Sequence, residues 1–335
     1  MAKPKPGLGL VMLSFGAAPL AKNAALVREA EALGYTSLWT PEVVGPDAFI
    51  TLAAYALNTS RIELGTGVVP IQIRTPGVMG MSFLTLNELS GGRAFAGLGV
   101  SSPVIVERWH GASYPRPLTA MRECIQIMRQ LFTEGRAKFE GRVYRSDFRL
   151  GMRLTQKPPR IYIAALNPPM LRLAGELADG VLFNFSPPEA MAELIAEVRA
   201  GATEAGRDPD AIELGVYIRM SATNDERAAM DAFKRELAGY AFVEAYKQMF
   251  ARYGLAAELA EVRTRWQAGR RDDAFEAISD ASASKIGLVG SAEKAREFVA
   301  RFRRAGITNP VIFPIGPAET IERDFANTMR ALAGA

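Results

Sequence analysis

The chain has 335 residues, 49% of them hydrophobic, and its 40 basic and 36 acidic residues give a formal net charge of +4. Such a chain can bury a large core, and its small net charge does not call for nucleic acid or a membrane surface as a partner. A single cysteine, Cys124, excludes an internal disulfide, and the single histidine, His110, lacks a partner for a metal site.

At the N-terminus, Lys3 and Lys5 precede the apolar run Leu8–Leu13, as in a signal peptide. Ser14 ends this run early, and an amphipathic helix is predicted over Pro19–Leu33. We therefore expect a first core strand and a cytoplasmic protein. No stretch of the sequence approaches the roughly 18 consecutive apolar residues of a membrane span.

Short apolar runs and amphipathic stretches alternate along the chain. We predict strands at Leu8–Ser14, Ser37–Thr40, Ile62–Val69, Arg93–Val100, Ile161–Leu166, Val181–Phe185, Ile212–Met220 and Pro310–Ile315. The helices predicted between them include Pro19–Leu33, Ala48–Leu57, Gly77–Leu89, Leu118–Phe132, Glu189–Ala205 and Ala292–Arg304. This alternation indicates an α/β fold with a parallel sheet, either a closed barrel or an open doubly wound sheet. The eight strands, and the lack of a Gly-x-Gly-x-x-Gly motif after the first, favour a single (β/α)8 TIM-barrel domain over residues 1–335.

Two regions depart from the alternation. Residues 135–160 carry eight Lys or Arg around a Phe-Glu-Gly-Arg-Val-Tyr turn, and we expect a solvated basic hairpin insertion toward the barrel face opposite the active site. Residues 222–284 follow the seventh strand, on the face where insertions form substrate pockets or lids, and we expect a helical insertion there. Four arginines of this region are placed where they could meet an anionic ligand: Arg263, Arg265, Arg270 and Arg271. The simpler explanation is that they lie on an exposed helix face.

The segment Arg160–Asn184 predicts a strand, a tight turn, a helix and a second strand. Asn167 can cap the helix, Pro168 can occupy its first turn, and Gly180 ends it. A helix that starts directly after a parallel strand presents free N–H groups and the positive end of its dipole above the sheet, where a phosphate can bind. An ordinary crossover without a ligand is the alternative, and such turns are more common.

Small residues dominate the C-terminal ends of the predicted strands, where the active site of a barrel lies. These ends are Thr40–Glu42, Gly65–Pro70, Gly97–Ser102 and Ala164–Asn167. Small side chains leave room for a flat ligand against the backbone, and glycine turns that bind nothing are the alternative. Glu42 is the only carboxylate at these ends, so it is either a proton donor in an apolar pocket or a structural acid at a strand terminus.

Five motifs follow one another along the chain: Leu64-Gly-Thr-Gly-Val-Val-Pro70, Leu86-Asn-Glu-Leu-Ser-Gly-Gly-Arg93, Gly97-Leu-Gly-Val-Ser-Ser102, Trp109-His-Gly111 and Ile161-Tyr-Ile-Ala-Ala-Leu-Asn-Pro168. Together they resemble the luciferase-like flavin and deazaflavin oxidoreductase superfamily. The pattern is closest to the branch that uses coenzyme F420, similar to methylenetetrahydromethanopterin reductase. The resemblance covers about residues 8–185 and 286–315, whereas residues 222–284 carry no motif that we recognise.

The resemblance implies that the ring of the cofactor stacks against a bulge after the third strand. A non-prolyl cis peptide bond between Gly67 and Val68 would form this bulge, with Val68 behind the ring. The implied contacts to the ring and its polar chain are Thr40, Gly67, Val68, Val69, Gly99, Ser101 and Ser102. The implied phosphate contacts are Ala165, Leu166, Asn167 and Met170.

One position departs from the family pattern. Many relatives carry an Asp-His pair at the end of the second strand, where this chain has Pro41 and Glu42. We take Glu42 as the candidate catalytic residue, in a proton-transfer role. The departure leaves the substrate unidentified.

The resemblance implies an enzyme that transfers hydride between coenzyme F420 and an organic substrate, without a metal. The alternative is a luciferase-like monooxygenase that uses reduced FMN and oxygen, because both cofactors present a flat ring, a ribityl-type chain and a phosphate to the same turn. A protein that binds a cofactor without catalysis is a third possibility. The superfamily also implies a homodimer, for which the apolar segment Val78–Leu84 either supplies a face or packs on the barrel.

Overall fold

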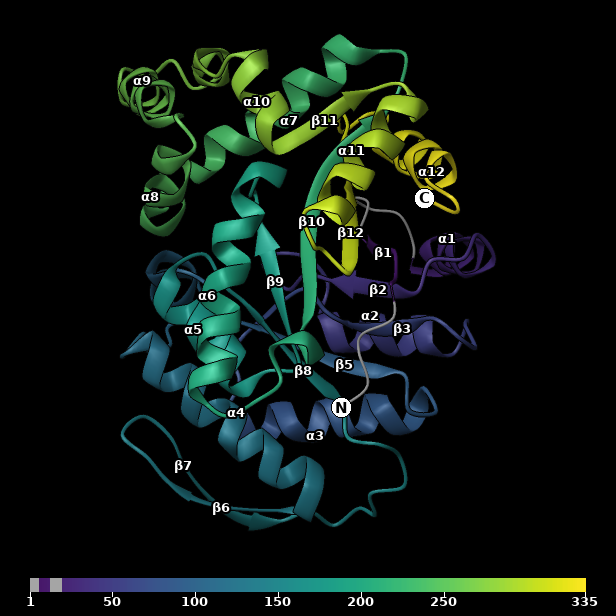
Figure 1. Cartoon of the computed structure of the whole chain (residues 1–335), viewed down its shortest axis with the longest axis vertical. Helices are drawn as coiled ribbons and strands as arrows, with labels where there is room; N and C mark the ends of the chain where they lie inside the picture. The colour runs from purple at the N-terminus through teal and green to yellow at the C-terminus, as the bar shows by residue number, and fades with distance from the viewer. Residues whose placement is uncertain (1–5, 13–19) are drawn as a thin grey trace.

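The computed structural model describes residues 6–12 and 20–335. The barrel strands are β1 (Gly9–Val11), β2 (Ser37–Thr40), β3 (Glu63–Thr66), β5 (Ala94–Gly99), β8 (Arg160–Ala164), β9 (Gly180–Asn184), β10 (Glu213–Ala222) and β12 (Asn309–Pro314). They pair in parallel in this order, and β12 pairs with β1 to close the circle (Figure 1). This confirms the predicted (β/α)8 TIM barrel. Leu13, Ser14 and Pro19, expected in the first strand and helix, lie outside the described residues.

Helices cover the outside of the barrel (Figure 1). They are α1 (Leu20–Ala32), α2 (Ala48–Ala56), α3 (Pro76–Leu89), α4 (Pro117–Glu134), α5 (Pro168–Leu177), α6 (Met191–Glu204), α11 (Ala292–Arg304) and α12 (Ile321–Ala331). In α11, Ser291 caps the first turn by accepting a hydrogen bond of 3.3 Å from the N–H of Lys294. Its apolar residues recur on one side, and that side, which includes Phe298 and Phe302, is buried in the core.

Side chains alternate between the inside and the outside of the barrel wall, as successive residues of a strand must. Inside, a buried central layer is formed by Val11, Trp39, Phe95, Tyr162, Leu182, Tyr217 and Val311. Their strand neighbours, such as Leu38 and Leu64, face the helices and belong to the larger outer core. The centre of the barrel is therefore filled with side chains.

Two short strands extend the barrel sheet. The predicted strand Ile62–Val69 is divided, so that β4 (Val69–Pro70) pairs with the end of β5. A further strand, β11 (Gly287–Gly290), pairs with the last four residues of β10, Arg219–Ala222. The sequence did not predict β11, and β10 continues beyond the part of it that pairs with β9.

An antiparallel hairpin, β6 (Arg136–Glu140) and β7 (Arg145–Arg149), lies between α4 and β8. Glu123 on α4 fixes the turn of the hairpin, because its carboxylate accepts hydrogen bonds of 2.7, 2.9 and 2.8 Å from the backbone N–H groups of residues 142–144. Tyr144 then donates a hydrogen bond of 3.0 Å to the carbonyl of Ile71, just after β4. The tip of the hairpin thus reaches the C-terminal end of the barrel. The expectation that the hairpin lies toward the opposite face is therefore wrong for its tip, whereas at its base the N–H of Leu150 donates to the carbonyl of Gly135, at the end of α4.

Between β10 and β11 the chain is helical. It forms α7 (Glu226–Tyr240), α8 (Glu244–Arg252), α9 (Ala256–Gln267) and α10 (Asp280–Ile286). Their apolar side chains share a second core with Phe185, Phe313 and Ile315, which follow or end barrel strands. These helices therefore lie above the C-terminal end of the barrel (Figure 1). In the part of the chain that the structure describes, no helix is long and apolar enough to cross a membrane.

Candidate active site

A bulge between β3 and β4 marks the mouth of the barrel. The peptide bond between Gly67 and Val68 is cis, as the resemblance implied. The Gly67 N–H donates to the carbonyl of Thr40 on β2 (2.8 Å), and the Tyr217 hydroxyl on β10 donates to the carbonyl of Gly67 (2.6 Å). A Cβ at position 67 would lie 1.8 Å from the Tyr217 oxygen, so only glycine fits beside this tyrosine. The bulge is thus held from the neighbouring strand and from the opposite wall.

Next to the bulge, β5 and β8 end in small residues. A Cβ at Gly99 would lie 2.5 Å from Cγ2 of Val68 and 4.0 Å from Cβ of Ala164. The Val68 side chain is only partly buried. It lies beside Gly99, where the barrel wall is bare backbone because glycine has no side chain. A flat, mostly apolar ring needs such a surface in order to approach the backbone. These residues therefore fit a flavin or deazaflavin ring.

The loop after β5 brings two serines to the same end of the barrel. The Ser101 carbonyl accepts a hydrogen bond of 3.3 Å from the hydroxyl of Tyr114. The Ser102 carbonyl accepts one of 3.0 Å from the N–H of Val106, in the π-helix Val104–Trp109. Both serines are partly exposed, and the Ser101 hydroxyl has no hydrogen-bond partner among the described residues. That hydroxyl is available to a polar group of a ligand.

The turn between β8 and α5 differs from its expected form. Asn167 caps α5, because its side chain accepts a hydrogen bond of 3.2 Å from the N–H of Met170. The two residues between them, Pro168 and Pro169, open the helix and have no N–H to donate. The expectation that the first turn of α5 offers free N–H groups is therefore wrong. Leu166 and Asn167 still stand at the C-terminal end of β8, where they were predicted.

Four of the predicted contact residues turn their side chains away from the mouth. Trp39 points into the barrel, so the side chain of Thr40 lies on the other face of β2. Val69, Ala165 and Met170 are buried in the outer core, between the barrel wall and the helices. The side chains of these four residues therefore do not face the barrel mouth.

Glu42, the predicted catalytic residue, lies after β2 and is paired with Arg74. Its carboxylate oxygens accept hydrogen bonds of 3.0 Å from Nε and Nη2 of the guanidinium, and one also accepts from the Ala48 N–H at 3.0 Å. Asp47 pairs with the same guanidinium and caps α2. The hydrogen bonds to Glu42 and Asp47 raise the pKa of Arg74 against the effect of burial. Donors surround the carboxylate, so of the two alternatives left open for Glu42 these contacts fit the structural acid and not the apolar pocket.

Known proteins match this chain over most of its length. The family model of luciferase-like monooxygenase matches residues 8–309. A putative coenzyme F420-dependent oxidoreductase of Mycobacterium tuberculosis is 33% identical, over 95% of this chain and 97% of that protein. The chain belongs to the luciferase-like monooxygenase family. It is therefore an enzyme, an oxidoreductase of this family.

Further matches show how widely this luciferase-like fold is shared. The 5,10-methylenetetrahydromethanopterin reductase of Archaeoglobus fulgidus is 32% identical, over 87% of this chain and 89% of that protein. The solved coenzyme F420-dependent tetrahydromethanopterin reductase of Methanopyrus kandleri has a TM-score of 0.84 at 24% identity, over 98% of both chains. An FMN complex of the oxygenating constituent of 3,6-diketocamphane monooxygenase from Pseudomonas putida has a TM-score of 0.70 at 18% identity, over 98% of this chain and 97% of that chain. The fold alone does not separate the two kinds of cofactor.

The sequence did not point to a buried charge at the mouth of this luciferase-like barrel. Arg219 is the next residue after Tyr217 on β10 whose side chain points into the barrel, and only 2% of the residue is exposed. Its guanidinium carbon is 3.8 Å from the ring centre of Phe185 and 4.0 Å from that of Phe313, and Nε donates to Glu236 on α7 (3.1 Å). The available signal was the alternation along β10, which puts Tyr217 and Arg219 on one face.

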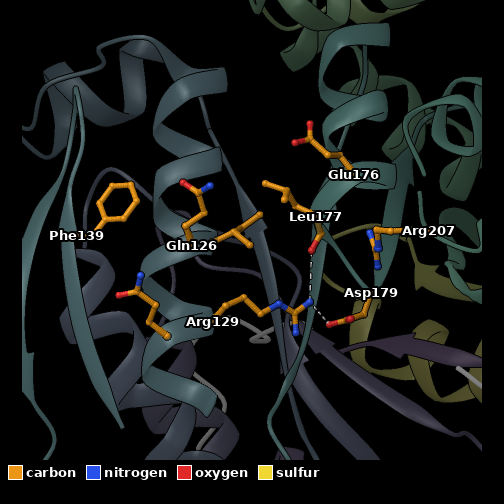
Figure 2. A pocket seen from close by; sticks show the side chains of 9 residues that line it. Gln126, Arg129, Phe139, Glu176, Leu177, Asp179 and Arg207 are labelled. Atoms are coloured by element: carbon orange, nitrogen blue, oxygen red, sulfur yellow. Dashed lines mark hydrogen bonds and ion pairs between the residues drawn. The ribbon is translucent and has the colours of Figure 1, made fainter. Parts of the chain in front are cut away.

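A separate cavity of about 580 Å³ lies outside the barrel of this luciferase-like enzyme, and Figure 2 shows the side chains that line it. Two arginines line it, and both already have partners. Arg129 pairs with Asp179 at 2.6 Å, and Arg207 donates to the carbonyls of Gly175 and Ala178. None of the predicted site residues lines this cavity. The barrel mouth is therefore the candidate active site.

Proposed function

We propose that this enzyme transfers hydride between coenzyme F420 and an organic substrate that is not yet identified. The observation that carries the proposal is the 33% identity, over nearly the whole chain, to a putative coenzyme F420-dependent oxidoreductase. The bulge and the glycine-lined wall support it, because they offer a flat surface at the end of the barrel where catalysis occurs. When bound, the deazaflavin supplies a carbon atom that accepts or donates the hydride.

In this proposal the residues of the mouth hold, orient and shield the cofactor. Val68 stands behind the ring, and Gly99 lets the ring approach the wall. The Ser101 hydroxyl donates to the polar chain. The helices that pack on Phe185 exclude water from the space above the ring, which strengthens every polar interaction there.

The contacts of Glu42 support a positioning role. Its carboxylate holds Arg74, whose guanidinium carbon lies 4.9 Å from the ring centre of Phe49 on α2. The backbone N–H of Glu42 also donates to the carbonyl of Val68 at 3.3 Å. The loop after β2 and the bulge are therefore tied together through Glu42. The proton-donating role expected from the sequence stays a prediction.

A luciferase-like monooxygenase that uses reduced FMN and oxygen is the second candidate. The FMN-bound monooxygenase with the same fold favours it, and the glycine-lined wall suits either ring. The deazaflavin has carbon in place of the ring nitrogen at its reactive position and does not react readily with oxygen. The two candidates therefore predict different redox chemistry from the same site.

A binding titration separates the two candidates. Purified enzyme is titrated with coenzyme F420 and, separately, with FMN, and the fluorescence of each cofactor is followed. Tight binding of the deazaflavin alone is expected. Tight binding of FMN with none of the deazaflavin would overturn the proposal and move the enzyme to oxygen chemistry.

We also propose that the enzyme is a homodimer that buries the outer faces of α2 and α3. Within the predicted apolar segment, Val78 and Met81 are 46% and 40% exposed, whereas Phe83 packs in the core. On the adjacent helix α2, Ile50 is 69% exposed, and Leu57, which caps the C-terminal end of this helix, is 70% exposed. Exposed apolar side chains on two neighbouring helices are typical of a protein interface. Met81→Lys should shift the mass measured by light scattering from dimer to monomer, and a wild-type monomer would contradict this assignment.

A further inference from the structure

The start of α5 lacks the hydrogen-bond donors that a phosphate site on a helix N-terminus normally provides. Of its first three residues, Pro168 and Pro169 carry no N–H, and the N–H of Met170 donates to the side chain and the carbonyl of Asn167. The N–H of Leu171 donates to the same carbonyl, at 3.0 Å. A phosphate placed here meets the positive end of the helix dipole but almost no free donors. Donors from elsewhere in the chain are needed.

Arg252 brings such donors to this turn. It is the last residue of α8, and its Nη2 donates a hydrogen bond of 2.9 Å to the carbonyl of Leu166, next to the cap residue Asn167. The side chain is exposed. Within residues 6–12 and 20–335, this is the one hydrogen bond of its guanidinium, which has five N–H groups in total. Arg252 is thus held at the turn while most of its donors are available.

The other arginines of the helical region are placed differently. Arg263 donates a hydrogen bond of 3.4 Å to the carbonyl of Ala241, Arg265 pairs with Glu261, and Arg270 pairs with Asp273. Arg271 stacks on a tryptophan of α9, at 5.4 Å from the ring centre. The four arginines expected to meet an anion therefore do not include the one that reaches the β8–α5 turn.

We propose that Arg252 binds the phosphate of the cofactor and replaces the missing N–H donors of α5. The inference rests on the proposed function, because it takes the β8–α5 turn as the phosphate end of the site. A guanidinium suits this task, since its planar fork matches two phosphate oxygens at once. The hydrogen bond to Leu166 holds the fork at the turn before the ligand arrives. The affinity for the cofactor then depends on α8, which belongs to the helical region above the barrel.

The test uses two pairs of ligands, each with and without the phosphate. FMN and riboflavin differ in the phosphate alone, whereas coenzyme F420 also carries an acidic tail beyond it. One pair is coenzyme F420 and its deazaflavin ring with the ribityl chain but no phosphate; the other is FMN and riboflavin. Dissociation constants of the whole enzyme are measured by fluorescence for wild type, Arg252→Ala and Arg252→Lys. Loss of a charge-assisted hydrogen bond should weaken binding of the phosphorylated form about 10- to 100-fold in Arg252→Ala, and the phosphate-free form less than about twofold. Arg252→Lys should recover part of the loss.

Arg270→Ala is the matched control, because Arg270 lies in the same region and pairs with Asp273. It should bind both forms as the wild type does. The midpoint temperature of thermal unfolding is measured for each variant, and a value near that of the wild type shows that the fold is kept. The second readout is the dependence of Kd on salt concentration. In Arg252→Ala the slope of log Kd against log salt concentration should be lower than in the wild type, for the phosphorylated form only.

Three outcomes overturn the inference. One is equal weakening of the phosphorylated and phosphate-free forms, which indicates a structural role for Arg252. Another is unchanged affinity of Arg252→Ala for the phosphorylated form. The third is failure of the wild type to bind either phosphorylated cofactor, which overturns the proposed function as well. If the wild type binds FMN but not the deazaflavin, the proposed function fails alone, and the FMN and riboflavin pair decides the role of Arg252.

Discussion

At the N-terminal end of the barrel, ion pairs and hydrogen bonds join side chains of several strands, whereas the mouth combines paired side chains, such as Glu42 and Arg219, with a hydroxyl that has no partner among the described residues. At the N-terminal end, Arg160 pairs with Glu63 and with Glu213 (2.7 Å), and Glu213 also accepts a hydrogen bond of 2.8 Å from the amide of Asn309. At the mouth, the Ser101 hydroxyl has no partner among the described residues. Groups that satisfy one another stabilise the fold, whereas groups without a protein partner can serve a ligand. The free hydroxyl therefore lies at the same end of the barrel as the bulge at Gly67.

The largest expected effect is at the mouth, from Gly67→Ala. The added Cβ would lie 1.8 Å from the Tyr217 hydroxyl, so the bulge or the tyrosine must move. We expect the affinity for the cofactor to fall roughly 100-fold, as overpacking of a tight contact does. Fluorescence titration measures it, and Gly67→Ala combined with Tyr217→Phe should recover part of the loss. Wild-type affinity in Gly67→Ala would show that the bulge does not support the ring.

The second prediction addresses the opposite end, through Arg160→Met. The change leaves Glu63 and Glu213 without their cation, and we expect the free energy of unfolding to fall by roughly 2 kcal/mol in urea denaturation. Burial already raises the pKa of Glu63, so the loss should grow as the pH rises and this carboxyl ionises. The cofactor dissociation constant should stay at the wild-type value. A change in affinity as large as that of Gly67→Ala would remove the contrast between the two ends.

Glu42→Gln sharpens the contrast at the mouth, because it separates positioning from proton donation. If Glu42 positions Arg74, the affinity for the cofactor should fall about tenfold and the pH profile of turnover should keep its shape. Asp47→Asn, which removes the other partner of Arg74, should then give a similar but weaker effect. A lost limb of the pH profile, with unchanged affinity, would favour proton donation.

The smallest effect concerns Glu31, at the N-terminal end of the barrel. Burial opposes its ionisation, but hydrogen bonds from the backbone N–H groups of Ile62, Arg61 and Ser60 lower the pKa of Glu31 from 4.5 to about 2. The unfolded state therefore binds this proton more tightly than the folded state, so the stabilisation is complete above about pH 4.5 and is lost as the pH falls toward 2. Glu31→Gln should lower the free energy of unfolding at pH 7 by roughly 1 kcal/mol and flatten its pH dependence in that window.

Glu29→Gln is the control for Glu31, because Glu29 lies on the same helix and its ion pair is exposed. Exposed pairs contribute little to stability, so a smaller change is expected. An unaltered pH dependence in Glu31→Gln would assign the acid transition to other carboxylates.

The barrel could be predicted because its information is local. Each of the eight predicted strands has its counterpart, since apolar runs between amphipathic helices indicate buried parallel strands. The strand β11 was not predicted, because four residues carry little pattern and their pairing with Arg219–Ala222 depends on a distant segment. The limits of the hairpin and of the helical region as insertions, and the single-domain organisation, stay predictions.

The candidate site was harder to predict, because the environment of each residue is set by contacts with residues that are distant in the sequence. The sequence left two environments open for Glu42, an apolar pocket or hydrogen bonds at a strand terminus, and only the fold places Arg74 beside it. The alternation along β10 puts Arg219 on the inner face, but the partners that bury it come from three separate segments and could not be predicted from its sequence neighbours. The missing donors at Pro168 and Pro169 were visible in the sequence, and the interpretation of α5 overlooked them.

Strand β10 extends beyond the C-terminal end of the barrel. Its first residues pair with β9, and its middle residues pair with β12 as far as Met220. Its last four residues, Arg219–Ala222, pair with β11, so that the final two have no partner strand in the barrel. All four helices above the mouth are attached between the projecting end of β10 and β11. They can therefore be exchanged between relatives at these two junctions without altering the other strands. A chimera that carries the helices of a relative should acquire the substrate range of the donor, and it should keep the cofactor affinity of the host only if the donor has an arginine at the position of Arg252.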